Sequence, residues 1–206
     1  MRMYSSLIFL PFILIHSPIY GVSKEFSHKS SLTLSIYYEA LCVDCMNIFK
    51  QLQKLLEVRG IRQKVHFDLV PYGKANLIGE GVFSCQHGNS ECFFNKIHGC
   101  AKRDLGYDDS LDFMVCMMSS CSNQYRCLFK ECELGKRIDT SKLLKCAIEE
   151  GNTIMYNMKE LSSAFSLEVG VFVPTVVFNK EYSQEVQSKA LSNLTKTVLE
   201  YLNENE

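Results

Sequence analysis

Apolar and polar residues alternate along residues 32–38, directly after a polar stretch. This period of two, together with β-branched and aromatic residues, predicts a β-strand. From Cys42 onward the apolar residues recur every three or four positions, which predicts a helix that ends at Gly60. Residues 65–70 predict a second short strand, closed by Pro71. The order strand, helix, strand predicts a β-α-β unit of the kind that builds a parallel sheet.

The regular pattern breaks down between about residues 73 and 160, where glycines indicate loops among clustered cysteines. Two apolar runs in this segment, 111–118 and 143–158, predict helices. Beyond it, the β-branched run 169–178 predicts a strand, and the apolar face of residues 184–201 predicts one final helix. The predicted fold class is therefore α/β, with a cysteine-rich, largely helical or loop insertion.

The first 21 residues predict a signal peptide, because Arg2 precedes the apolar run Leu7–Ile15 and the small residue Gly21 follows it. The run is shorter than the roughly 20 residues that span a bilayer, so an uncleaved anchor is the weaker alternative. No later segment predicts stable membrane insertion. Residues 22–206 are then expected to form one domain in the secretory pathway.

The composition, 47% hydrophobic and 22% charged, is typical of a globular protein. The formal net charge is −1, and Lys and Arg residues form no block along the sequence. This charge pattern argues against nucleic acid or an acidic membrane surface as a partner.

Ten cysteines in a secreted chain predict disulfides, and they fall into two groups. Cys42 and Cys45 stand apart near the start of the predicted domain. The other eight crowd into the predicted insertion, where we expect structural disulfides whose pairing the sequence leaves open. These are Cys85, Cys92, Cys100, Cys116, Cys121, Cys127, Cys132 and Cys146.

Cys42 and Cys45 lie where the first predicted strand gives way to the helix, so both sulfurs share one face of a helical turn. The unpaired N–H groups and the dipole of a helix N-terminus stabilise a thiolate at Cys42. Cys42 is therefore the predicted nucleophile that attacks the disulfide of a substrate protein, and Cys45 resolves the mixed disulfide. This chemistry requires no cofactor, but an external thiol reductant must restore the oxidised enzyme.

Two simpler roles for this pair are weaker alternatives. A zinc site would need a second pair of Cys or His ligands at suitable spacing, which is not evident, so we expect no metal. A permanent Cys42–Cys45 disulfide would close so short a loop that it would constrain the unfolded chain little.

Pro174 interrupts the strand-like run near the end of the chain, where a proline removes a ladder hydrogen bond. A cis Val173–Pro174 bond is the favoured explanation, and a trans proline on an edge strand is the alternative. In thioredoxin-like proteins, which the cysteine pair resembles, such a proline lies against the active cysteines and the backbone before it binds substrate. Val173 and Pro174 are therefore candidate substrate-binding residues.

The segments Tyr37–Cys45 and Cys85–Cys100 carry more specific motifs. The second reads CQHG-x2-EC-x2-N-x4-C, with fixed positions at Cys85, Gln86, His87, Gly88, Glu91, Cys92, Asn95 and Cys100. Both segments resemble the gamma-interferon-inducible lysosomal thiol reductases, and the similarity extends over about residues 32–201. The resemblance implies a thioredoxin-like fold and the reduction of protein disulfides in endosomes or lysosomes at acid pH.

Val43 departs from this family, which often has proline at that position, so the resemblance does not imply the reductive strength of the pair. We expect the signature itself to be structural. His87 is a candidate pH-sensitive group, with an ordinary loop histidine as the simpler alternative.

Two other functions stay open at this point. A secretory-pathway disulfide oxidase or isomerase uses the same fold and cysteines at a different redox potential. A non-catalytic, cysteine-rich binding protein would keep all ten cysteines in permanent bridges. The sequon Asn193-Leu194-Thr195 predicts a glycan at Asn193, and the expected location is the secretory pathway, with the protein in lysosomes or endosomes or secreted.

Overall fold

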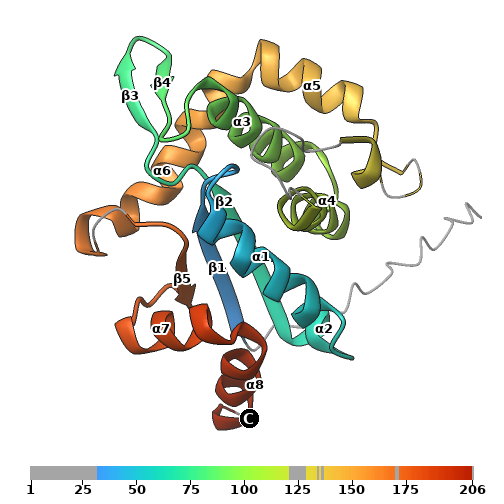
Figure 1. Ribbon diagram of the computed structural model, residues 1–206, viewed down its shortest axis with the longest axis vertical. Helices are drawn as coiled ribbons and strands as arrows, with labels where there is room; N and C mark the ends of the chain where they lie inside the picture. The colour runs from blue at the N-terminus through green and yellow to red at the C-terminus, as the bar shows by residue number, and fades with distance from the viewer. Residues whose placement is uncertain (1–31, 121–128, 134, 136, 170–171, 206) are drawn as a thin grey trace, which may run out of the picture.

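The computed structural model describes residues 32–120, 129–133, 135, 137–169 and 172–205 (Figure 1). The predicted signal peptide, Cys121 and Cys127 lie outside these residues. Among the helices that are described, none combines the length and the apolar character needed to cross a bilayer.

A three-stranded sheet in the order β2-β1-β5 lies at the centre of the fold. β1 (Leu32–Tyr38) pairs in parallel with β2 (Val65–Pro71) and antiparallel with β5 (Thr175–Phe178). The helix α1 (Val43–Leu56) and the short α2 (Ile61–Lys64) connect β1 to β2. The predicted β-α-β unit is therefore confirmed.

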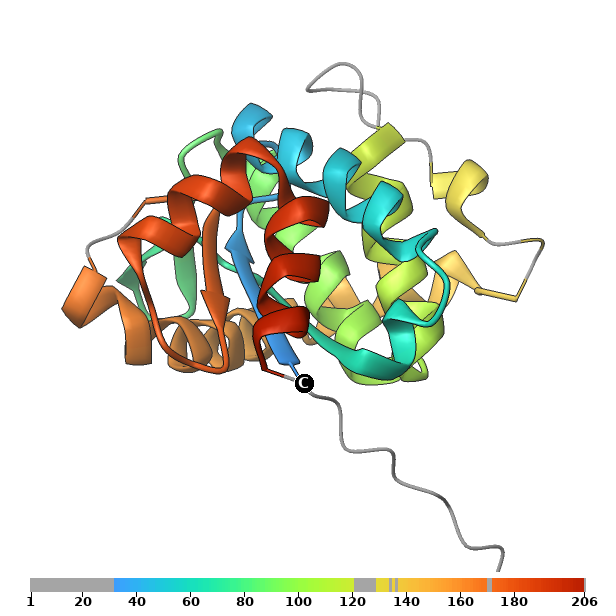
Figure 2. The same ribbon diagram turned by 90° about the horizontal axis from the view of Figure 1, so that it is seen from below.

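Helices cover both faces of the sheet, as Figure 2 shows. On one face, α1 lies with α7 (Gln184–Ser192) and α8 (Leu194–Glu204) and packs against α8. On the opposite face lies α6 (Gly151–Val169). The apolar side of α1 is fully buried at Phe49 and Leu52. Because burying one such side chain contributes about 1.5–3 kcal/mol, this stripe attaches α1 to the core.

The segment between β2 and β5 is largely helical, as expected. Its remaining elements are β3 (Asn76–Gly79), β4 (Val82–Ser84), α3 (Asn89–Asp104), α4 (Tyr107–Ser120), the 3-10 helix η1 (Phe129–Cys132) and α5 (Thr140–Glu149). The predicted helix 111–118 lies inside α4, which packs against α1 and α3. In addition α3 and α6 contact β2, so the segment is packed onto the sheet.

Two predicted elements in the second half have wrong boundaries. The predicted helix 143–158 is divided between α5 and α6 at Glu150, and a side chain at Gly151 would collide with Lys96. The predicted strand 169–178 is wrong in its first part, because α6 continues to Val169 and β5 begins only at Thr175. A β-branched residue has only a slightly lower helix propensity, so Val169 can end a helix, and composition alone misplaced this boundary.

The predicted single helix 184–201 is also wrong, because Asn193 divides it into α7 and α8. Asn193 leaves the helical conformation, with φ −156° and ψ 90°, and its Oδ1 accepts the N–H of Lys196 at 3.0 Å. Its side chain therefore caps the N-terminus of α8 while the residue stays exposed.

Candidate active site

Cys42 stands at the N-terminus of α1, immediately after the loop that follows β1. Its backbone has φ −75° and ψ 124°, the extended conformation of an N-cap residue, and its Sγ accepts the N–H of Cys45 at 3.3 Å. The N–H of Met46 donates to the carbonyl of Cys42 at 2.9 Å, so the helix starts at this cysteine. A sulfur therefore takes the place of the Ser, Thr or Asp oxygen that usually accepts hydrogen bonds at a helix N-terminus.

The two sulfurs differ in exposure and in acidity. Both cysteines are free; Cys42 is 8% exposed, and Cys45 is fully buried. Hydrogen bonds from the thiol and N–H of Cys45, and from the N–H of Asp44, lower the pKa of Cys42 to about 7, against burial and the charge of Glu39. Burial, and then the interaction with Cys42, raises the pKa of Cys45. As the pH rises, the pair therefore loses its first proton at Cys42.

The Val173–Pro174 peptide bond is cis, which confirms that expectation. Thr175 pairs with Tyr37 at the end of β1. The bond therefore lies beside the point where the chain leaves β1 toward Cys42. Next to Cys42, the side chain of Val43 is 53% exposed, so an apolar group is accessible at the start of α1.

Gln187 of α7 supports the proline segment and was not identified from the sequence. Its buried side chain donates from Nε2 to the carbonyl of Pro174 at 2.9 Å and accepts the N–H of Val176 at Oε1, at 2.7 Å. One amide thus completes the hydrogen bonds on both sides of Thr175. Hydropathy does not indicate such a role, because Gln187 lies in the polar run Gln187-Ser188-Lys189 between Val186 and Ala190.

Two buried side chains of the signature reach the loop before Cys42 or lie close to it. Asn95 of α3 accepts the N–H of Ala40 through Oδ1 at 2.9 Å. Glu91, one helical turn earlier, accepts the N–H of His87 at 3.0 Å and pairs with its Nδ1 at 2.5 Å. Asn95 and Glu91 have no exposed surface. The signature therefore positions the loop of the free dithiol in addition to forming disulfides, and the spacing of these two residues on one helix face was the overlooked signal.

Glu39, in the same loop, is a second buried carboxyl that sequence reasoning missed. Its Oε1 accepts the N–H of Lys74 at 2.7 Å. Gly73 has φ +55°, and a Cβ on it would lie 2.2 Å from Cγ of Glu39, so only glycine lets this turn close over the carboxyl. Ligand-type atoms of Glu39, His87 and Glu91 lie within 4.8 Å of one another, the one such group among the described residues. The expectation of no metal stays a prediction.

Tyr38 ties the end of β1 to α3 through its buried hydroxyl, which lies 2.9 Å from Nδ1 of His98. Nε2 of His98 has no hydrogen-bond partner within the described part of the chain. Burial lowers the pKa of His98 to about 3. The imidazole is therefore neutral at pH 5 and above.

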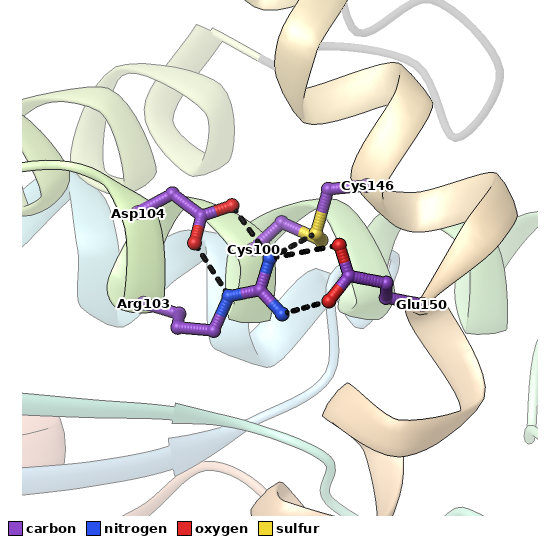
Figure 3. A network of polar contacts seen from close by, with 5 residues as sticks. All are labelled: Cys100, Arg103, Asp104, Cys146 and Glu150. Carbon is purple, nitrogen blue, oxygen red and sulfur yellow. Dashed lines mark hydrogen bonds and ion pairs between the residues drawn. A yellow bond between two sulfur atoms is a disulfide. The ribbon is translucent and has the colours of Figure 1, made fainter.

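Six of the eight cysteines of the insertion form disulfides within the described residues. The pairs are Cys85–Cys92, Cys100–Cys146 and Cys116–Cys132. Figure 3 shows the bridge between Cys100 of α3 and Cys146 of α5, with Arg103 beside it in ion pairs with Asp104 and Glu150. These bridges join separate elements, whereas Cys42 and Cys45 belong to a single helical turn.

Residues 33–136 match the model of a protein family described as gamma interferon inducible lysosomal thiol reductase (GILT). A relative from Carassius auratus named gamma-interferon-inducible lysosomal thiol reductase is 30% identical over 176 residues, covering 81% of this chain and 67% of the relative. GILT-like protein 1 of Drosophila melanogaster is 27% identical over 190 residues, covering 84% and 76%.

Solved structures support the fold class. DsbA of Chlamydia trachomatis has a TM-score of 0.53 at 10% identity and covers 85% of this chain and 88% of that chain. A thioredoxin-like oxidoreductase from Silicibacter pomeroyi has a TM-score of 0.50 at 15% identity, covering 84% and 87%. At these identities the similarity concerns the fold alone, and the predicted thioredoxin-like fold is confirmed. With the family match over residues 33–136, the chain is a thiol-disulfide oxidoreductase and belongs to the gamma interferon inducible lysosomal thiol reductase family.

Proposed function

We propose that this chain reduces disulfide bonds of protein substrates, with Cys42 as the nucleophile and Cys45 as the resolving thiol. The Cys42 thiolate attacks one substrate sulfur, the substrate S–S bond breaks, and the leaving sulfur takes up a proton. Cys45 then loses its proton and attacks Sγ of Cys42, which forms the Cys42–Cys45 disulfide and releases the second substrate thiol. Two electrons pass to the substrate, and an external thiol reductant restores the dithiol.

The unequal acidity of the two free cysteines carries this proposal. The pKa of Cys42 is lowered to about 7, whereas burial raises that of Cys45. An unperturbed thiol with a pKa of about 8.5 is only about 0.03% thiolate at pH 5, and a pKa of about 7 gives about 1%. The same shift reduces the nucleophilicity of the thiolate by about fivefold, so attack at acid pH still gains about sixfold.

The lowered pKa of Cys42, about 7, also favours reduction over oxidation. A very stable thiolate stabilises the reduced enzyme and makes its disulfide a strong oxidant, as in DsbA, whose reactive cysteine has a pKa of about 3.5. The corresponding pKa in the reductant thioredoxin is about 7. The fold similarity to DsbA therefore does not favour an oxidase here.

We assign substrate contact to the exposed Val43 and to the backbone at Val173 and Pro174. Val43 offers an apolar surface next to Cys42, and the proline segment borders the end of β1. An extended substrate chain can pair with such backbone while its disulfide reaches Sγ of Cys42. Unfolded disulfide proteins are the substrate class that meets this requirement.

We place the reaction in the secretory pathway, in lysosomes or endosomes or after secretion. The predicted signal peptide supports entry into this pathway, and the Carassius auratus relative is named a lysosomal enzyme. The exposed sequon at Asn193 is compatible with a glycan, because attachment at Nδ2 leaves Oδ1 to cap α8.

Reduction of a denatured disulfide protein, measured from pH 4 to 8 with the redox potential of the dithiol, tests this proposal. We expect activity to persist at pH 4 to 5.5 and the potential to lie below about −200 mV. A potential near −120 mV with activity confined to neutral pH would instead identify an oxidase of the early secretory pathway. Retention of activity in Cys42→Ser would reject the proposed nucleophile.

A further inference from the structure

The environment of Glu39 disfavours a negative charge. The residue has no exposed surface, Oε1 accepts one hydrogen bond from the N–H of Lys74, and Oε2 has no partner among the described residues. Gly73 packs directly on the side chain and leaves no room beside it. Because an ionised carboxylate with an unpartnered buried oxygen is costly, these contacts favour the protonated acid.

Glu91 lies close enough to make this preference stronger. Ligand-type atoms of Glu39, Glu91 and His87 lie within 4.8 Å of one another, and both carboxyls are fully buried. Two carboxylates at such a distance do not both ionise readily, so one of them retains a proton. The backbone N–H of His87 donates to Glu91, and Nδ1 of His87 lies 2.5 Å from the second carboxyl oxygen of Glu91, whereas Glu39 receives a single hydrogen bond, from the N–H of Lys74. The proton therefore belongs on Glu39.

The charged groups facing Glu39 come from three neighbouring segments. Burial first, and then the charge of Glu91, raises the pKa of Glu39 to about 7, against the N–H of Lys74 and the positive charges of His87 and Lys74. The N–H of Cys42 donates to the backbone carbonyl of Glu39 at 3.3 Å, so Glu39 adjoins the start of α1. From this position the negative charge of its side chain raises the pKa of Cys42 and of Cys45. Glu39 and the dithiol are thus electrostatically coupled, and each disfavours a negative charge on the other.

We propose that Glu39 is a positioning residue for the reductase reaction. Its carboxylate takes up a proton as the pH falls, and this removes a negative charge beside Cys42. Above neutral pH, ionised Glu39 opposes the thiolate. Below neutral pH, Glu39 is uncharged and no longer opposes the thiolate. A larger fraction of Cys42 then remains thiolate than if Glu39 stayed ionised. The charges of Glu91 and His87 beside Glu39 set the pH at which Glu39 takes up its proton. This inference rests on the proposed role of Cys42.

The alkylation rate of Cys42, measured from pH 4 to 9 in the reduced protein, tests the coupling without turnover. Glu39→Gln keeps the size of the side chain and an oxygen for the N–H of Lys74. We expect this variant to react about three- to tenfold faster than the wild type near pH 7, where the wild type is partly ionised at Glu39. At pH 4 to 5, where Glu39 is neutral in both proteins, the two rates should be equal.

Two further variants distinguish this coupling from a general charge effect. Glu91→Gln removes the neighbouring charge, so Glu39 should ionise at lower pH and slow the alkylation of Cys42 from that pH upward. Glu57→Gln removes an exposed charge at the other end of α1 and should reproduce the wild-type profile. Profiles of wild type and Glu39→Gln that run parallel from pH 4 to 9 would overturn the inference, even if Cys42 proves to be the nucleophile. A Cys42 pKa near 8.5 would instead count against the proposed function.

A cation at this cluster is the competing explanation, and it has its own test. In the double variant Cys42→Ser, Cys45→Ser, titration with Co²⁺ followed by absorption reports binding without interference from the thiols. We expect no stoichiometric binding at pH 5 to 7. Stoichiometric binding that disappears in Glu91→Gln would overturn the proton-exchange role and make the cluster a cation site.

Discussion

The cysteines at the β1–α1 junction and those between α3 and α5 are used in opposite ways. Cys42 and Cys45 are three residues apart and free. Cys100 and Cys146 are separated by 46 residues and bonded. A bridge across a long loop removes many conformations of the unfolded chain, whereas a bridge within one turn removes few. The comparison teaches that loop length separates stabilising cysteines from a pair that can open and close at little cost to the fold.

The polar groups around the sulfurs differ as well. At the junction, the N–H of Cys45 donates to Sγ of Cys42, and both residues are buried. In Figure 3, Arg103 donates to Sγ of Cys146 at 3.3 Å, and its ion pair with Glu150 joins side chains that are 38% and 53% exposed. An exposed ion pair contributes only about 0–1 kcal/mol. The covalent bridge, rather than the charges, therefore holds α5 on α3.

Replacing Cys42 with Ser should separate activity from stability most sharply. Serine supplies no thiolate, so we expect thiol release from a denatured disulfide protein to fall by at least about a thousandfold. The unfolding free energy in urea should change by less than about 1 kcal/mol, because a serine oxygen still accepts the N–H of Cys45. A loss of several kcal/mol would show that this cysteine stabilises the fold and would remove the contrast between the two regions.

Removing the Cys100–Cys146 bridge should produce the opposite result. The loop of 46 residues predicts a loss of about 4 kcal/mol in the double Ala variant, against about 2 kcal/mol for Cys85–Cys92, whose separation is 7. Urea unfolding in the background of the double variant Cys42→Ser, Cys45→Ser, which leaves neither thiol of this pair to exchange with the bridges, measures both. Where the bridge variants that retain Cys42 and Cys45 remain folded, alkylation of Cys42 should proceed as in the wild type. Equal losses for the two bridges would contradict the dependence on loop length.

The buried His98, which connects α3 to β1, should make the unfolding free energy depend on pH. Its pKa is lowered to about 3 in the fold, while histidine in an unfolded chain titrates near 6.5. Between these values the unfolded state binds more protons, so this residue reduces the unfolding free energy by about 2 kcal/mol from pH 7 to 5. Glu39 has the opposite effect on the unfolding free energy. Its pKa is raised to about 7, so the folded state binds the extra proton and this residue increases the unfolding free energy from pH 7 to 5.

Urea unfolding at pH 7 and 5 checks both signs. The two effects offset each other in the wild type, so its stability should change little between these pH values. His98→Gln should become more stable on acidification by about 2 kcal/mol, and Glu39→Gln less stable by a similar amount. Two variants that follow the wild type at both pH values would show that neither group titrates as the structure indicates.

The helices α7 and α8 contain no cysteine and serve as a reference for both regions. Asn193→Gln should remove the cap of α8 and cost about 1 kcal/mol of unfolding free energy. Thr195→Ala removes the same sequon but leaves the cap in place, so its stability should stay near that of the wild type. In protein from eukaryotic cells, both variants should lose the mobility shift caused by endoglycosidase. A wild type without that shift would reject the glycan.

Sequence reasoning was most successful where one physical signal dominates. The alternation along β1 and the apolar stripe of α1 reflect burial on one face, and both elements were predicted with small boundary errors. The free pair Cys42 and Cys45 could be singled out because its position at the start of a helix is a local property, and its redox role stays a prediction. The break at Asn193 was missed because α7 and α8 each bury one face, so the apolar pattern continues across the cap.

Helix α3 was missed for a different reason. Its buried face includes Glu91, Asn95 and His98, which hydropathy scores as surface residues. Asn95 accepts the N–H of Ala40, and His98 lies against the hydroxyl of Tyr38, so each has one polar contact with a residue distant in the sequence. Such partners become visible only in three dimensions. The environment of Glu39 was unpredictable on the same grounds, since it depends on α3 and on the turn at Gly73.

The most direct test of the division between reactive and structural cysteines is to trap the mixed disulfide in Cys45→Ser. The variant is incubated at pH 5 with a denatured disulfide protein, quenched by alkylation, and mapped by mass spectrometry of its peptides. Since Cys42 can attack but no thiol can resolve the product, we predict a covalent complex joined through Cys42 and absent from the double variant Cys42→Ser, Cys45→Ser. Full multiple turnover without such a complex, or substrate attached to one of the six bridged cysteines, would contradict the account.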